Sequence, residues 1–331
     1  MATGYRLALA LYAPPIMTDR LNRRIRFDQP NPRVGRIMLT EADFILLEAI
    51  DRHGPLPSNY LYEFTRHLRK DKSHLQNRLT EFYHGDAGGP YLARPPQQFA
   101  SFHARYSHVV YDLSDRAKGL LAERGTLIAH PPRRTDPFLH RLMQACVGAS
   151  LELCSGFHGL RYISRDEILT HPKIGAAKDA KNPMALPLPG FAENSAVIPD
   201  DLFGLEYPGT GFRFFAVEID RNTESIERKN LAYNTIGKKV EGYLQVLIDK
   251  RYRTWWGIPN LSVLMVTTSA GHAQNILAHI GKQVDPRYAE RFAITAEPVF
   301  GANWRVPPGL INQLLDEPWR TPGGSKFIGR P

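Results

Sequence analysis

Apolar residues in the first third of the chain recur at the spacing of short amphipathic helices. Thr40 and Asp43 have the Thr-x-x-Asp pattern of a capping box just before such a run, and Gly54 follows the run, so a helix is predicted between them. Leu75 and Leu79 mark the buried face of a later helix. The whole pattern predicts four helices, over residues 40–54, 58–67, 71–85 and 114–124.

Two runs typical of β-strands, residues 91–94 and 107–113, precede the last of these helices. Three helices, a β-hairpin and a closing helix are the order of a winged helix-turn-helix, whose third helix enters the major groove while the hairpin contacts phosphates. A winged module used only for protein contacts is the alternative. The predicted DNA contacts are Lys72, His74, Gln76, Asn77 and Arg78 on the third helix and Arg94 and Arg105 on the hairpin.

The second half of the chain alternates between helix and strand patterns. Prolines between residues 125 and 138 indicate a linker before it, and residues 172–194 have the composition of a long loop. Arginines gathered between residues 20 and 36 indicate a basic arm, which either contacts phosphates or is a solvated tail. The predicted organisation is an arm (1–36), a winged-helix domain (37–126), a linker (127–137) and a second domain (138–331).

Charge and composition narrow the class of protein. Lysine and arginine number 42 against 33 acidic residues, a net charge of +9 that suggests a polyanionic partner such as DNA, although ordinary variation in surface charge is the alternative. Two cysteines in the whole chain argue against a disulfide-stapled secreted fold. No apolar run approaches the roughly 20 residues that span a bilayer, and the N-terminal residues lack a signal-peptide cleavage site, so we expect a cytoplasmic protein without membrane contact.

The candidate chemistry lies between residues 196 and 243. Residues 212–219 read as a central strand that carries Glu218 and then Asp220, and residues two apart on a strand share a face. A hairpin would bring Asp200 or Asp201 beside them. Three carboxylates in one cleft repel one another unless a cation balances them, and hard oxygen ligands fit Mg²⁺ or Mn²⁺.

A long helix predicted from residue 223 or 225 to about residue 250 follows this strand. It carries Lys239 and Tyr243 four positions apart, hence on one face, from which both side chains could lean towards the carboxylates. Glu152, on a helix predicted over residues 137–154, is either exposed or a fourth acid of the site. Trp255 and Trp256 are either a base-stacking patch or core residues.

These motifs resemble a known family. The order of a helix, a Pro-Asp hairpin, a strand bearing Glu-x-acid, a helix and a further strand is similar to the PD-(D/E)xK core of restriction-endonuclease-like enzymes. The segments Glu218-Ile219-Asp220-Arg221-Asn222-Thr223, Lys239-x-x-x-Tyr243 and Pro318-Trp319-Arg320 resemble the replication-relaxation family more specifically. That family pairs a winged helix with this core and is similar to atypical endonuclease-fold plasmid relaxases. The resemblance covers residues 38–321.

The resemblance implies an α+β or α/β fold, with a winged helix-turn-helix followed by a restriction-endonuclease-like domain. It also implies that Asp200 and Glu218 hold Mg²⁺ or Mn²⁺. Asp220 is a candidate for a further ligand on the carboxylate pattern alone, because it departs from the pattern of the family. A lysine is expected where Asp220 stands, and Lys239 is its natural replacement, with Lys238 second. The catalytic set implied is Asp200, Glu218, Asp220, Lys239 and Tyr243.

The implied function is site-specific binding and metal-dependent nicking of double-stranded DNA at an origin-type site of a plasmid or mobile element, in replication, mobilisation or conjugation. Other replication or transfer proteins are possible partners, and a monomer and a dimer both stay open. The alternative is a non-catalytic winged-helix accessory factor or transcriptional regulator with a degenerate nuclease core; a restriction enzyme is a third reading. No Gly-x4-Gly-Lys-Ser/Thr loop or His-hydrophobic-His triplet occurs, which argues against ATP-driven work and against the usual histidine-metal relaxase.

Overall fold

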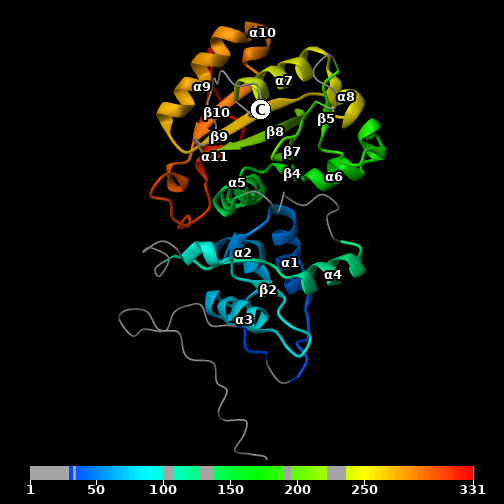
Figure 1. The fold of residues 1–331 in the computed structure, drawn as a ribbon, viewed down its shortest axis with the longest axis vertical. Helices are drawn as coiled ribbons and strands as arrows, with labels where there is room; N and C mark the ends of the chain where they lie inside the picture. Colours follow the sequence, from blue (N-terminus) through cyan, green and yellow to red (C-terminus); the bar gives the residue numbers. More distant parts are fainter. Residues whose placement is uncertain are drawn as a thin grey trace, which may run out of the picture.

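The computed structural model describes residues 30–32, 35–99, 107–126, 137–189, 195–221 and 236–330. They form a mixed α+β fold, with a helical module at one end of the long axis and a large sheet at the other (Figure 1). Most of the predicted basic arm, residues 127–136 of the predicted linker and the predicted start of the long helix at residues 223–225 lie outside the described residues. No described helix is long and apolar enough to cross a membrane.

The module follows the predicted order of helices and strands. Its elements are α1 (Glu41–His53), β1 (Leu56–Pro57), α2 (Ser58–Thr65), η1 (Arg66–Leu68), α3 (Lys72–His84), β2 (Leu92–Ala93), η2 (Pro96–Phe99), β3 (Val110–Leu113) and α4 (Asp115–Arg124). The capping box is confirmed, since the Thr40 amide donates to Asp43 Oδ2 at 2.8 Å. The hairpin strands β2 and β3 are shorter than the predicted runs of residues 91–94 and 107–113. The unpredicted β1 pairs with β3, giving the antiparallel order β1-β3-β2.

The second half begins with one long helix and continues as alternating strands and helices. Its elements are α5 (Phe138–Phe157), β4 (Arg161–Ile163), α6 (Arg165–Thr170), η4 (Ala176–Asp179), β5 (Leu186–Pro187), β6 (Ala196–Val197), β7 (Asp201–Tyr207), β8 (Gly211–Asp220), α7 (Ile236–Ile248), α8 (Arg251–Trp255), β9 (Ser262–Thr267), α9 (Ala270–Gln283), α10 (Pro286–Ala289), β10 (Phe292–Ala296), η5 (Pro298–Phe300), α11 (Gln313–Asp316), β11 (Trp319–Thr321) and β12 (Gly324–Lys326). The predicted long helix ends at Ile248, close to the predicted end at about residue 250, and Lys250 with φ 53° separates it from α8.

Seven strands form one sheet in the order β12-β11-β10-β9-β8-β7-β4, so β8 is one of the central strands, beside the middle strand β9, as predicted. β8, β9 and β10 run parallel, whereas β7 pairs with β8 as an antiparallel hairpin. Alternate side chains of β8 serve different layers: Phe215, Val217 and Ile219 pack on the side of α5, and Phe214 and Ala216 pack on the side of α7 and α9. In Figure 1, α5 lies between the sheet and the helical module, and α7, α9 and α10 lie beyond the sheet.

The module and the second half share one hydrophobic core. Leu46, Leu47 and Leu61 from the module belong to the same buried cluster as Val147 and Leu151 of α5. Polar contacts reinforce this junction, because Glu152 of α5 accepts from Arg52 Nη1 and lies 2.7 Å from His53 Nε2. Glu152 is therefore an ion-pair partner of α1 in this fold and is not exposed, and its polar partners are Arg52 and His53 rather than Asp200, Glu218 or Asp220.

Trp255 and Trp256 pack in the core and do not form a base-stacking patch. Trp256 is fully buried, and both indole Nε1 atoms donate to the Pro183 carbonyl at 2.9 Å. Trp319, from the Pro-Trp-Arg segment, is also buried and donates to the Leu314 carbonyl at 2.7 Å. These indoles hold loops against the sheet and leave no stacking platform between Trp255 and Trp256.

Candidate functional site

Glu218 is the centre of a buried polar cluster on β8. Its side chain points towards α7 and is 2% exposed. Tyr243 Oη donates to Glu218 Oε1 at 2.5 Å, and Lys239 Nζ lies 3.0 Å from Oε2. The lysine contact is an ion pair that does not meet hydrogen-bond geometry, so Oε2 retains its capacity to accept. The predicted spacing of Lys239 and Tyr243 thus brings both to one carboxylate.

Asp200 joins this cluster at the start of the β7–β8 hairpin. Its backbone amide donates to the Val217 carbonyl at 2.9 Å, and its Oδ2 accepts from the Ile219 amide at 2.8 Å. Its Oδ1 lies 3.4 Å from His140 Nε2 on the first turn of α5. Asp200 is therefore fixed at the backbone on both sides of Glu218, where the predicted hairpin places it.

The environment pushes the two carboxyl groups in opposite directions. Burial raises the pKa of Glu218 to about 7, and the nearby Asp200 carboxylate adds to this, while Lys239 and Tyr243 oppose it. Burial also opposes ionisation of Asp200, but His140 and Lys239 hold the pKa of that carboxyl below its usual range. Burial and the Glu218 charge raise the pKa of Tyr243 well above its usual value. One ionised acid beside one poised to lose a proton is a pattern found at catalytic centres.

Asp220 has a different partner. It shares the face of β8 that carries Glu218, as predicted, but its Oδ2 lies 2.5 Å from His272 Nε2 on the first turn of α9. The amide of His272 itself donates to the N-capping Ser269 hydroxyl. Neither His140 nor His272 was predicted, because each is a single histidine on a helix, far in sequence from the aspartate that it contacts.

The oxygen atoms of this cluster that lack a hydrogen-bond donor indicate whether the cluster could hold a divalent cation. Glu218 Oε2 and Asp220 Oδ1 are buried without a hydrogen-bond donor, and so is Oε1 of Gln144, whose amide nitrogen donates to the Asp200 carbonyl. Buried oxygens of this kind call for an ion or water. Within the described residues, no group of three or more His, Cys, Asp or Glu side chains is arranged to hold a metal. Mg²⁺ is commonly held by one or two carboxylates plus substrate phosphates, and Asp200 with Glu218 fits that smaller donor set.

The predicted DNA contacts fall into two groups. Lys72, His74, Gln76 and Asn77 are exposed on α3, at the end of the molecule opposite the sheet (Figure 1). Arg94 instead lies over the Tyr83 and Tyr111 rings, with its guanidinium carbon 4.0 and 5.3 Å from their centroids, and donates to Tyr111 Oη. Arg105 lies outside the described residues.

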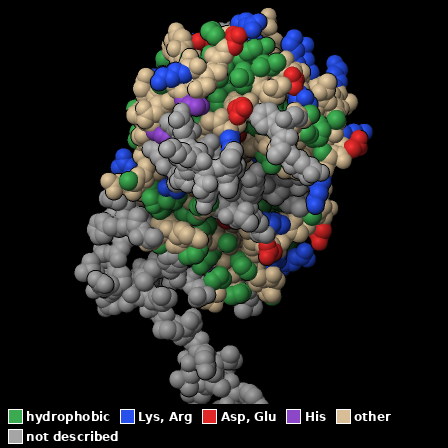
Figure 2. All heavy atoms as spheres, turned by 45° about the horizontal axis from the view of Figure 1, so that its top comes forward, with side chains coloured by type: hydrophobic (Ala, Val, Ile, Leu, Met, Phe, Trp, Pro, Cys, Tyr) green, Lys and Arg blue, Asp and Glu red, His purple; other side chains and the backbone are tan. Residues whose placement is uncertain are grey.

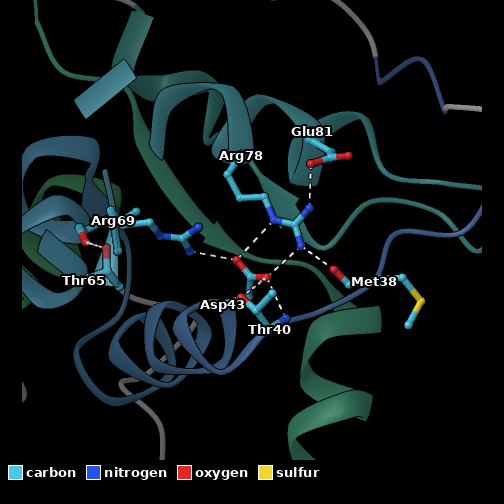
Figure 3. Close-up of polar contacts among 8 residues, drawn as sticks. Met38, Thr40, Asp43, Thr65, Arg69, Arg78 and Glu81 are labelled. Carbon is cyan, nitrogen blue, oxygen red and sulfur yellow. Dashed lines mark hydrogen bonds and ion pairs between the residues drawn. The ribbon is translucent and has the colours of Figure 1, made fainter. Parts of the chain in front are cut away.

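The Arg78 guanidinium is hydrogen-bonded to other groups of the protein (Figure 3). It donates to both oxygens of the fully buried Asp43, to Glu81 Oε2 at 2.6 Å and to the Met38 carbonyl at 2.6 Å. Arg69 donates to the same Asp43 from the other side at 2.8 Å. The geometry makes Arg78 a brace between α3 and α1 rather than a side chain free to contact a base.

Charged side chains do not form one continuous basic patch in the described part of the face shown in Figure 2. Lysine and arginine side chains lie singly or in small groups there, among acidic and apolar side chains.

The fold and its site define a mixed α+β protein whose central strand buries an acid between a tyrosine, a lysine and a second acid. The chain belongs to the replication-relaxation family, whose pattern matches residues 47–258. The matched segment runs from α1 past α8, so it contains Asp200, Glu218, Lys239 and Tyr243 but ends before His272. The family points to a role in replication or plasmid processing. No curated protein and no solved structure matches the chain.

Proposed function

We propose that this protein binds DNA at a specific site and nicks one strand in a reaction that depends on Mg²⁺ or Mn²⁺. The observation that carries the proposal is the position of Glu218, buried against Lys239 and Tyr243 with Asp200 fixed beside it. An acid whose pKa is raised to about 7 beside a lysine is costly in a purely structural core. A role in catalysis would account for an acid that is buried between a lysine, a tyrosine and a second acid.

In this proposal Asp200 and Glu218 hold the divalent ion, which would polarise a phosphodiester and lower the pKa of a water molecule. Lys239 supplies the positive charge that a nuclease core normally takes from the position of Asp220, and it stabilises the charge that develops on the phosphate. Tyr243 fixes the rotamer of Glu218 through its hydrogen bond. His140 does the same for Asp200.

Site selection is assigned to the helical module, which we interpret as a winged helix attached to a restriction-endonuclease-like core. The exposed polar face of α3, with Lys72, His74, Gln76 and Asn77, is the proposed base-reading surface. Because α3 lies at the far end of the long axis from the sheet, the bound site and the nicked bond are separated along the DNA (Figure 1).

The test is a nicking assay with the full chain and supercoiled plasmid that carries the cognate origin region. With Mg²⁺ or Mn²⁺, wild type should convert supercoiled DNA to open circles, and Glu218→Gln, Asp200→Asn and Lys239→Met should each lower the rate at least 100-fold. Glu206→Gln on β7, an exposed acid paired with Arg161, is the matched control and should nick like wild type. Failure of wild type to nick under these conditions, or full activity of Glu218→Gln, would reject the enzymatic reading.

A second candidate, a DNA-binding accessory factor or regulator without catalysis, is favoured by one observation. Asp220 stands where a lysine is expected and is engaged with His272. Calorimetric titration with Mn²⁺ separates the two readings. Binding that is lost in Asp200→Asn supports the enzyme, whereas tight DNA binding by a protein without a Mn²⁺ site supports the regulator.

A further inference from the structure

Arg221 directly follows the two acids of β8 and has no partner of its own in the described part of the chain. Its side chain is partly buried, and its Nε is buried with no hydrogen-bond acceptor. No ion pair with another described residue involves its guanidinium. A cation placed in this way at the end of the central strand calls for an explanation.

Other buried arginines of this protein are compensated. Arg69 is paired with Asp43 at 2.8 Å, and Arg165 with Asp201 at 3.1 Å. Carboxylate partners raise the pKa of Arg78 above its usual value in spite of burial, whereas burial lowers the pKa of Arg221, which has no carboxylate partner among the described residues. Arg221 therefore carries the desolvation penalty of a guanidinium without the interaction that normally offsets it.

The position of Arg221 indicates what kind of ligand would offset it. The strands β8, β9 and β10 are parallel, and ligands of such sheets bind at the carboxyl ends of the strands, where Arg221 lies. A guanidinium matches the oxygens of a phosphate with two parallel hydrogen bonds. An anion at this edge of the sheet would be close to the carboxylates of β8 without being bound by them.

Strand alternation separates Arg221 from the bond that is cut. Arg221 is the first residue after β8, which ends at Asp220, and the alternation of the strand continued by one residue directs Arg221 to the side opposite Asp220 and Glu218. The guanidinium thus serves a phosphate next to the reacting one along the strand.

We propose that Arg221 binds a backbone phosphate of the substrate DNA strand adjacent to the phosphate at Asp200 and Glu218. This inference rests on the proposed function, because it takes the substrate to be a polynucleotide. Arg221 is a binding residue in this scheme: it holds the strand across the carboxyl edge of the sheet, and the chemistry stays with the acids and Lys239.

The experiment measures binding and nicking separately in the full-length protein. Anisotropy of a short fluorescent single-stranded oligonucleotide in EDTA reports strand affinity without cleavage. Arg221→Gln should weaken that affinity about tenfold and make the log–log salt dependence less steep by about 0.7, as expected when the protein neutralises one phosphate fewer on a single strand. Arg221→Lys should keep the salt dependence and recover part of the affinity, because it keeps the charge but loses the planar fork.

The matched control is Arg287→Gln on α10, whose arginine is 80% exposed and paired with Asp285. It removes the same charge from the chain and should leave oligonucleotide binding unchanged. In the nicking assay, Arg221→Gln should raise KM about tenfold with kcat within a factor of two. Thermal unfolding of Arg221→Gln should occur at or above the temperature of wild type, because the change removes a desolvated cation that no described residue compensates. Arg287→Gln should unfold like wild type.

The outcomes separate the two proposals. If wild type nicks and Arg221→Gln binds the oligonucleotide as well as wild type, the phosphate contact is wrong and the nuclease stands. If wild type does not nick but Arg221→Gln still weakens binding with the reduced salt slope, the phosphate contact stands and the nuclease falls. Equally weakened binding in Arg221→Gln and Arg287→Gln would overturn the phosphate contact by showing a general charge effect.

Discussion

Tyr243 Oη donates a hydrogen bond to Glu218 Oε1 at 2.5 Å and joins the face of α7 to the central strand across 25 positions of sequence. Lys239 lies one helical turn before Tyr243 and contacts the other oxygen of the same carboxylate. One helix face therefore sets both the orientation and the electrostatic environment of Glu218. The predictions about this acid follow from that arrangement.

Replacing Tyr243 by Phe should raise the pKa of Glu218 above about 7. The tyrosine hydrogen bond favours the ionised carboxylate, so its removal leaves burial and the Asp200 charge less opposed. In metal-free protein, NMR titration of the Glu218 side-chain carbonyl should show its midpoint moving to higher pH. The acidic limb of the nicking profile should move in the same direction.

Tyr207→Phe is the control for this effect. Tyr207 on β7 is also buried and donates to the Ile328 carbonyl at 2.5 Å, so its replacement removes a comparable buried hydrogen bond. Both variants should lose about 1 kcal/mol of unfolding free energy. A shifted Glu218 midpoint in Tyr207→Phe, or an unshifted one in Tyr243→Phe, would contradict the assigned role of Tyr243.

Glu297, which lies away from the candidate site, should make the unfolding free energy depend on pH. It is buried at the start of η5, and burial raises its pKa from 4.5 to about 7, while Gln313 donates to both of its oxygens. Between these two pKa values the native protein holds a proton that the unfolded chain has released, so unfolding free energy falls as pH rises from about 4.5 to about 7. Glu297→Gln should remove this loss, because the amide stays neutral and keeps one acceptor for Gln313.

The measurement is urea unfolding of wild type and Glu297→Gln at pH 5 and pH 8. The variant should be about 2–3 kcal/mol more stable than wild type at pH 8 and close to it at pH 5. Glu317→Gln, a neighbouring exposed acid, should change little at either pH. Equal stability of Glu297→Gln and wild type at pH 8 would mean that Glu297 is not desolvated in solution.

Sequence reasoning succeeded where the determining contact is local. The capping box of Thr40 and Asp43 spans four residues, and Lys239 and Tyr243 share a face because helix geometry alone fixes it. The hairpin that brings Asp200 to Glu218 is also a local feature, and the central place of β8 follows from its apolar composition.

Long-range partners account for the rest. The polar helix position of Arg78 predicts a DNA contact, but the tertiary fold places Asp43, 35 residues away, against it. Glu152 finds Arg52 at a separation of 100 residues, and Asp220 finds His272 at 52. A charged residue in a single sequence gives no sign of whether another element will bring it a counter-ion, so spacing alone does not separate site residues from structural ion pairs.

The two kinds of polar residue on α3 should behave differently when replaced. Asn77→Ala should weaken specific duplex binding by about 1–3 kcal/mol with stability unchanged, because Asn77 is exposed. Arg78→Ala should instead lower the unfolding free energy by about 1.5–3 kcal/mol, because the buried Asp43 loses hydrogen bonds from one of its two cations and keeps only Arg69. Gel-shift titrations and urea unfolding of the full chain measure the two effects.

Gln283→Ala, at an exposed position of α9, is the control for the binding experiment. Glu63→Gln is the control for stability, because its ion pair with the exposed Arg66 contributes little to the unfolding free energy. Normal stability of Arg78→Ala would show that Arg69 alone satisfies Asp43. Normal duplex binding by Asn77→Ala would remove that residue from the proposed reading surface.

Residues 30–126, produced without the second half of the chain, should not fold cooperatively. α1, α2 and β1 pack on α5, and Leu46, Leu47 and Leu61 lie in the cluster that α5 completes. Burial of each such side chain contributes about 1.5–3 kcal/mol, so uncovering several removes as much as the whole stability of a typical domain. The fragment should therefore show helical far-ultraviolet circular dichroism without a cooperative thermal transition, whereas the full chain unfolds cooperatively.

In the full chain, Glu152→Gln should weaken the same junction, because it removes the charge opposite Arg52 and His53. The melting temperature should fall, while α3 should still bind duplex DNA. A cooperative transition of the fragment near that of the full chain would show that the module carries its own sufficient core, and that α5 only covers it.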